Sequence, residues 1–240
     1  MKVTTNFLFL LGLGAVTSFA ADKAKDRENT LHRLNESTDM LKEMAGASDK
    51  GIPKDLIAKC KCAVIVPGVK KGGFIVAGKY GRGFVSCKKG TRFGAPSGVR
   101  VEGGSFGFQI GGSETDVIML VMNQKGAERL IASKFTLGGD ASVAAGPLGR
   151  ETTAQTDATM RAEMLSWSRS RGVFAGVALD GATLRPDGDA IEDLYGKKIE
   201  PKAILMGSTP VPASARTFIT ELNRFLPAPP AAAKKAPAKK

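Results

Sequence analysis

Apolar and polar residues alternate with a helical period in the amino-terminal part of the chain. The apolar stripe runs through residues 24–45, and its members follow one another at steps of three or four: Leu31, Leu34, Thr38, Leu41 and Ala45. This spacing predicts an amphipathic helix. Acidic and basic side chains nearly cancel around the stripe, whereas a helix that binds an anionic membrane is strongly basic. We therefore expect this helix to pack against its own domain.

Five short segments rich in Val, Ile and Phe follow, separated by clusters of Gly and Pro. They are residues 62–66, 73–78, 83–87, 104–110 and 117–122. Runs of β-branched and aromatic residues between turn residues are typical of strands. The series predicts a β-meander or a barrel-like sheet.

Helical signals return in the second half of the chain. Asn123 is a capping residue in front of a helix expected over 124–134, in which Leu130 and Ile131 face inward. Another helix is expected over 157–169.

The carboxyl-terminal part predicts a hairpin and a last helix. Residues 172–179 and the turn region 181–183 resemble a hairpin. Pro212 opens a helix whose apolar face holds Phe218, Leu222 and Phe225. Neither an internal repeat nor an interdomain linker is visible. The chain is expected to form one α+β domain over 21–226, a β-rich meander or barrel-like sheet covered by an N-terminal amphipathic helix, a central helix and a C-terminal helix.

The two ends of the chain differ in composition from this domain. An apolar run covers 7–19, and small residues stand at Ser18 and Ala20, the −3 and −1 positions of a cleavage site. This pattern predicts that residues 1–20 are a secretory signal peptide, with an uncleaved anchor as the alternative. The mature chain would then be exported, to a periplasm or to the outside. Residues 227–240 contain only Pro, Ala and Lys, which predicts a disordered cationic tail.

Composition narrows the function classes. Apolar residues make up 42% of the 240 residues and charged residues 24%, which is typical of a folded chain. Aromatic residues are only 6%, too few for a stacking platform that binds single-stranded nucleic acid. His32 is the single histidine, although most acid–base and metal-dependent chemistry relies on that side chain. We therefore expect a protein that is not an enzyme and that needs no cofactor.

The net charge of +12 is concentrated in one segment. Residues 59–100 contain ten Lys and Arg and no Asp or Glu, and we call this segment the basic block. A surface of one sign attracts phosphate groups, and anionic lipid headgroups are the phosphates available to an exported protein. Nucleic acid is not expected as a partner, and a solvated face that only aids solubility is the alternative. The candidate lipid-binding residues are Lys70, Lys71, Lys79, Arg82, Lys88, Lys89 and Arg92.

Two motifs resemble chemical sites but do not meet the requirements of those sites. Residues 103–107 fit G-x-S-x-G, but a nucleophile elbow needs a following helix and a downstream histidine, and neither is expected here. The spacing of Cys60, Cys62 and Cys87 does not fit a zinc site. A disulfide that joins Cys87 to Cys60 or to Cys62 is expected instead, and the third cysteine is buried or a free thiol.

An acidic cluster follows Pro186. Its members are Asp187, Asp189, Glu192 and Asp193, and their spacing does not fit a calcium-binding EF-hand loop. Acidic residues favour the first turn of a helix, so we interpret the cluster as a helix amino terminus. No catalytic or metal-binding residue is therefore assigned.

Several short motifs, in order along the chain, resemble the SYLF domain family. They include CKCAVIVP at 60–67, YGRG at 80–83, GFQIG at 107–111, FTLG at 135–138 and SRSRG at 168–172. The resemblance covers about residues 30–226. It implies lipid binding, because eukaryotic members bind phosphoinositides, and fungal members also bind and bundle actin.

The residues and the resemblance together lead to two hypotheses. The first is a non-enzymatic exported domain that docks anionic, phosphoinositide-like phospholipid headgroups on its basic block. The second is an envelope structural or interaction protein that binds an acidic polymer or a protein partner, in the way that the family's actin-binding members do.

Overall fold

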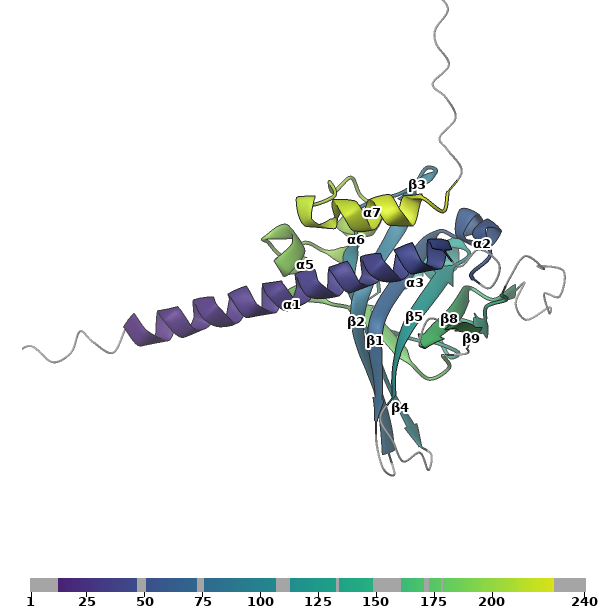
Figure 1. Ribbon diagram of the computed structural model, residues 1–240, viewed down its shortest axis with the longest axis horizontal. Helices are drawn as coiled ribbons and strands as arrows, with labels where there is room; N and C mark the ends of the chain where they lie inside the picture. The colour runs from purple at the N-terminus through teal and green to yellow at the C-terminus, as the bar shows by residue number, and fades with distance from the viewer. Residues whose placement is uncertain are drawn as a thin grey trace, which may run out of the picture.

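A sheet of ten strands forms the centre of the fold (Figure 1). The computed structural model describes residues 13–46, 51–72, 76–106, 113–132, 134–148, 161–170, 173–177 and 179–226. The strands are β1 (Cys62–Gly72), β2 (Val76–Lys89), β3 (Arg92–Phe93), β4 (Ser97–Phe106), β5 (Ser113–Val121), β6 (Phe135–Thr136), β7 (Val143–Ala145), β8 (Met164–Ser170), β9 (Val173–Gly176) and β10 (Thr183–Pro186).

The strands follow one another across the sheet in the order β6-β10-β4-β2-β1-β5-β8-β7, and β3 pairs with β2 and β9 with β8. β7 and β8 run parallel, and the other neighbours run antiparallel. The sheet is strongly curled into a half-barrel. This confirms the predicted α+β class with a barrel-like sheet.

Helices pack against this sheet and against one another. They are α1 (Leu13–Gly46), α2 (Lys54–Lys59), α3 (Gln124–Arg129), α5 (Gly188–Tyr195), α6 (Pro201–Leu205), the 3-10 turn η2 (Ala213–Ala215) and α7 (Arg216–Asn223). Figure 1 shows α1 crossing the sheet, and α1 contacts β1, β2, α5 and α7. None of the described helices is long and apolar enough to cross a membrane.

Both faces of the central strands are buried. On β1, Ala63 and Ile65 belong to the apolar cluster that also contains residues of α1 and α7. Cys62, Val64 and Val66 belong to a second cluster on the other face. Successive side chains of a strand point to opposite faces, so this alternation divides the core into two layers. Burial on both faces explains the continuous apolar run at 62–66.

The amino-terminal helix packs as the periodicity predicted. Leu34 and Leu41 are buried in the first cluster, and Thr38 donates a hydrogen bond to the carbonyl of Leu34 at 2.8 Å. The helix begins earlier than predicted, at Leu13, and residues 21–29 are exposed. The amino-terminal half of α1 therefore extends beyond the sheet (Figure 1).

Two predicted strands, 73–78 and 83–87, fall on the single long strand β2, although residues 73–75 lie outside the described residues. Gly81 and Gly83 do not form a turn here, and both are packed closely against β1. A Cβ atom on Gly83 would lie 2.1 Å from the carbonyl oxygen of Ile65 in the neighbouring strand. The strand predicted over 104–110 begins earlier, at Ser97, and residues 107–110 lie outside the described residues.

The helix predicted over 157–169 is wrong at its carboxyl end, since Met164–Ser170 form strand β8 against β5. Residues 157–160 lie outside the described residues. Pairing with a buried neighbour overrides local propensity here. The predicted hairpin over 172–183 is also wrong, because β9 pairs with β8 whereas β10 pairs with β4 and β6.

Two predicted helices are present with adjusted lengths. Asn123 caps α3 by accepting a hydrogen bond from the backbone N–H of Gly126 at 2.8 Å, but α3 ends at Arg129. The last helix begins as a 3-10 turn after Pro212 and buries Phe218 and Leu222, but it ends at Asn223, and Phe225 is buried just beyond it.

Candidate functional site

A disulfide fixes the pairing of β1 with β2. It joins Cys62 to Cys87, which is one of the two pairings that the sequence left open. Cys60 is a buried free thiol that donates to the carbonyl of Ile57. Burial raises the pKa of Cys60 to about 12, so this thiol stays protonated and poorly nucleophilic at neutral pH.

The far ends of β1 and β2 carry three lysines, which we call the hairpin lysines: Lys70, Lys71 and Lys79. Lys71 lies directly opposite Lys79 in the register, and Lys70 lies opposite Tyr80. Burial, and after it the neighbouring Lys71 cation, lowers the pKa of Lys79. None of the three forms an ion pair with another described residue. Figure 1 shows these strand ends extending away from the helices.

Three other candidates from the basic block are engaged inside the protein. The Lys88 ammonium donates to the carbonyls of Ile57 and Ala58 at 2.8 and 2.7 Å, at the end of α2. Arg92 donates to the carbonyl of Asn223 at 3.1 Å, and Arg82 pairs with a buried carboxylate described below. The remaining candidate, Lys89, is half-buried, and burial lowers its pKa.

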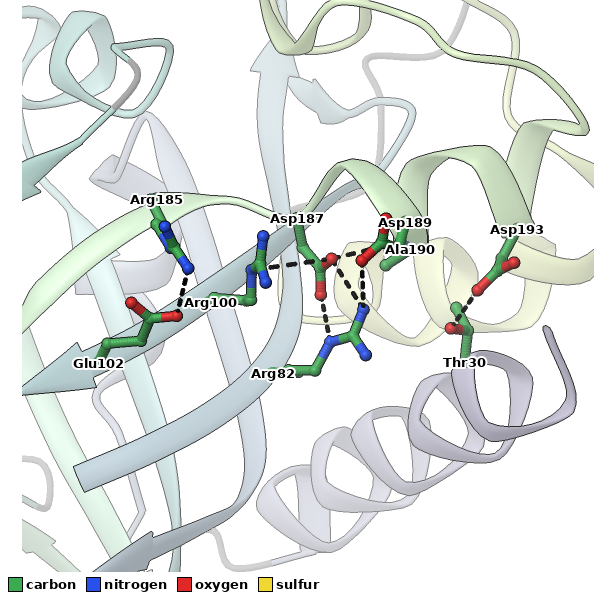
Figure 2. A network of polar contacts seen from close by, with 9 residues as sticks. All are labelled: Thr30, Arg82, Arg100, Glu102, Arg185, Asp187, Asp189, Ala190 and Asp193. Atoms are coloured by element: carbon green, nitrogen blue, oxygen red, sulfur yellow. Dashed lines mark hydrogen bonds and ion pairs between the residues drawn. The ribbon is translucent and has the colours of Figure 1, made fainter. Parts of the chain in front are cut away.

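A second group of cations lies on the sheet itself. Arg82 of β2 is directly opposite Arg100 of β4, and Arg100 is directly opposite Arg185 of β10. We call these three residues the arginine row. Asp187, whose side chain is fully buried, accepts hydrogen bonds from Arg82 Nε at 2.5 Å and Nη2 at 2.8 Å (Figure 2). This bidentate geometry is the strong form of a carboxylate–guanidinium pair.

The other two members of the arginine row are less fully paired. Arg100 Nε lies 3.9 Å from Asp187 Oδ1, beyond hydrogen-bond distance, and Arg185 donates to Glu102 at 2.8 Å. Asp187 also caps α5 by accepting from the backbone N–H of Ala190, as the acidic cluster predicted. Figure 2 shows Asp187 between the row and the first turn of α5.

A cavity of about 630 Å³ opens beside the arginine row. Its wall includes Arg100 and Arg185 from the sheet, Gly188 and Asp189 from the first turn of α5, and Lys198 and Glu200 before α6. Sequence reasoning did not find this site. Arg100 was counted in the basic block but not selected, and no local pattern relates Arg185 to Arg82.

In the described part of the chain, the remaining motifs do not meet the structural requirements of reactive sites. Ser105 lies within β4 and not at a strand-to-helix turn. His32 is exposed on α1, 3.6 Å from Glu36. Within the described residues, no group of three His, Cys, Asp or Glu side chains could hold a metal ion.

Comparison with known proteins places the chain in a family. The sequence profile of the Ysc84 family, described as "Las17-binding protein actin regulator", matches residues 102–225. A Schizosaccharomyces pombe protein named SH3 domain-containing protein PJ696.02 is 38% identical over 178 residues, which are 72% of this chain and 41% of that protein.

Two further relatives carry the family name. Human SH3 domain-containing YSC84-like protein 1 is 34% identical over 74% of this chain and 52% of its own length. Saccharomyces cerevisiae protein YSC84 is 32% identical over 73% of this chain and 38% of its own length. The chain thus spans about half or less of these relatives. Since the profile matches more than half of the chain, this protein belongs to the Ysc84 (SYLF) family.

Proposed function

We propose that this protein is a non-enzymatic domain that docks on anionic phospholipid membranes through the hairpin lysines. The observation that carries the proposal is the direct opposition of Lys71 and Lys79 at strand ends that extend away from the helices. Like charges directly opposite each other destabilise a sheet. An anionic surface would remove that repulsion, and each Lys near such a surface contributes about 1 kcal/mol.

The proposal leaves out Arg82, Lys88 and Arg92, because their donors are engaged inside the protein. Lys89 remains a predicted contributor. The proposal also includes export after cleavage of the signal peptide, to a periplasm or to the outside, where phospholipid headgroups are accessible.

A protein partner is the second candidate function. The family description names Las17 binding and actin regulation, and two of the relatives carry the name YSC84. In that case the hairpin lysines would meet acidic side chains and not lipid phosphates. Phosphoinositide selectivity belongs to the first candidate and would require one headgroup to bind more tightly than others of equal charge.

Vesicle co-sedimentation tests the proposal. The full chain is mixed with vesicles of phosphatidylcholine with or without phosphatidylglycerol, and the three hairpin lysines are replaced together by Glu. Binding should require phosphatidylglycerol, weaken as salt rises because exposed charges are screened within about 8 Å, and fall at least about tenfold in the triple variant.

The matched control replaces three exposed lysines elsewhere by Glu, at Lys54, Lys197 and Lys202. It makes the same change in net charge and should retain most of the binding. A second control deletes residues 227–240, because a cationic tail could bind vesicles alone. If the tail deletion removes binding and the hairpin variant does not, the proposal is wrong. An acidic protein ligand that binds where vesicles do not would support the second candidate.

A further inference from the structure

The arginine row carries more positive charge than its neighbours balance. Arg33 of α1 adds a fourth cation, and burial, followed by the nearby Arg82 cation, lowers the pKa of Arg33. Asp187 and Glu102 supply two carboxylates that accept hydrogen bonds from the row. Asp189 lies 3.9 Å from Arg82, but its side chain is 79% exposed and water screens it. The three cations of the row less these two carboxylates leave about one positive charge, and Arg33, which also has Glu36 nearby, adds a second.

Donors of the row also remain unused. Among the described residues Arg100 donates no hydrogen bond, and the Nε atoms of Arg100 and Arg185 are buried without a partner. Nearly all buried polar groups in proteins are hydrogen-bonded, so two unpaired guanidinium nitrogens in adjacent strands require an explanation. Directly opposed side chains have Cβ atoms about 5 Å apart, which is close enough for both guanidinium groups to reach one ligand.

Both arginines line the cavity beside the row. Arg100 and Arg185 both contribute to its wall, and Gly188 in the first turn of α5 lies on the same wall. α5 has eight residues, and its amino terminus adds the partial positive charge of a helix dipole. Lys198 is a further cation of the wall.

We propose that this cavity binds one phosphate group, either free or as a phosphomonoester headgroup, between the guanidinium groups of Arg100 and Arg185. A phosphate monoester carries about −1.5 to −2 charges at neutral pH, and the cavity wall offers it the cations of Arg100, Arg185 and Lys198. Its oxygens suit the planar fork of a guanidinium group. The site goes beyond the proposed membrane docking, because none of the hairpin lysines contributes to the cavity wall.

The acidic residues of the wall restrict what can enter. Asp189, Glu192 and Glu200 also line the cavity, and Glu192 pairs with Lys23 at 3.1 Å. Their charges would repel a long polyanion while leaving one compact phosphate beside the arginines. The cavity should therefore take a single phosphate group and not a polymer of phosphates.

Calorimetric titration of the full chain in phosphate-free buffer tests the site. One arm uses inorganic phosphate and the other uses a soluble short-chain phosphatidic acid. Arg100→Gln and Arg185→Gln should each weaken phosphate binding about tenfold, the expected effect of losing one charge-assisted hydrogen-bonding group. The phosphate affinity of Arg100→Lys should lie between those of the parent chain and of Arg100→Gln, since lysine keeps the positive charge but lacks the planar fork of the guanidinium group. Arg216→Gln, an exposed arginine of α7, is the matched control and should bind normally.

Thermal unfolding without phosphate separates binding from a structural role. Arg100→Gln removes one cation from a crowded row, so its Tm should equal or exceed that of the parent chain. If both glutamine variants bind phosphate as tightly as the parent chain does, the proposal is wrong, and so it is if neither arm shows binding at about 10 mM ligand.

The two titration arms identify the source of the phosphate group, and the hairpin variant separates this site from membrane docking. Tighter binding of phosphatidic acid than of inorganic phosphate indicates a lipid headgroup, whereas equal binding indicates free phosphate, and either result supports the site. The triple hairpin variant should bind phosphate normally. Failure of membrane docking can thus be distinguished from failure of this site.

Discussion

Replacing Asp187 by Asn tests whether one buried carboxylate stabilises the arginine row. The substitution keeps the size of the side chain and its ability to cap α5, since Asn and Asp are equally good capping residues. It removes the negative charge that Arg82 pairs with through two hydrogen bonds. Any loss of stability therefore reports on the charge and not on the helix cap.

The expected loss is large because Asp187 has no exposure to solvent. Removing one partner of a buried ion pair costs about 3–5 kcal/mol. The Arg82 side chain is 25% exposed, so water partly compensates it, and we expect about 2–4 kcal/mol. For a domain of this size that corresponds to a fall in Tm of about 5–15 °C.

Urea unfolding followed by far-UV circular dichroism, without reducing agent, measures the effect. Asp39→Asn, which removes an exposed carboxylate paired with Lys42, should leave the midpoint unchanged. In a double-mutant cycle with Arg82→Gln, the coupling energy should reach at least about 1.5 kcal/mol. A loss below about 1 kcal/mol for Asp187→Asn, or additive effects of the two substitutions, would refute the reasoning.

Three further predictions concern the amino terminus and the cysteines. Cleavage after Ala20 should give a mature protein that begins at the next residue. Mass spectrometry of cell fractions measures this, and detection of the intact amino terminus would contradict the prediction. The Cys62–Cys87 disulfide closes a loop with a sequence separation of 25, so replacing both cysteines by Ser should lower the free energy of unfolding by about 3.5 kcal/mol. A loss below about 1 kcal/mol would contradict this prediction. Because burial raises the pKa of Cys60 to about 12, iodoacetamide should label it at neutral pH only after unfolding, and rapid labelling of the native protein would contradict its burial.

Local patterns in the sequence were sufficient for much of the fold. The stripe from Leu31 to Ala45 predicted the packing of α1, and Asn123 and Pro212 marked the starts of two helices. These features depend on residues only a few positions apart. The strand at 164–170 could not be predicted in this way, because its conformation depends on pairing with β5, about fifty residues earlier.

The same distinction separates the two candidate sites. Composition alone located the basic block, and with it the hairpin lysines, because net charge is a property of the sequence. Composition did not indicate which cations are free. Asp187 lies 105 residues from Arg82, and the arginine row exists only because three strands align Arg82, Arg100 and Arg185 in register. A shift of one residue in that register would turn these side chains to the opposite face, so the tertiary structure decides which charges meet and which cavity they line.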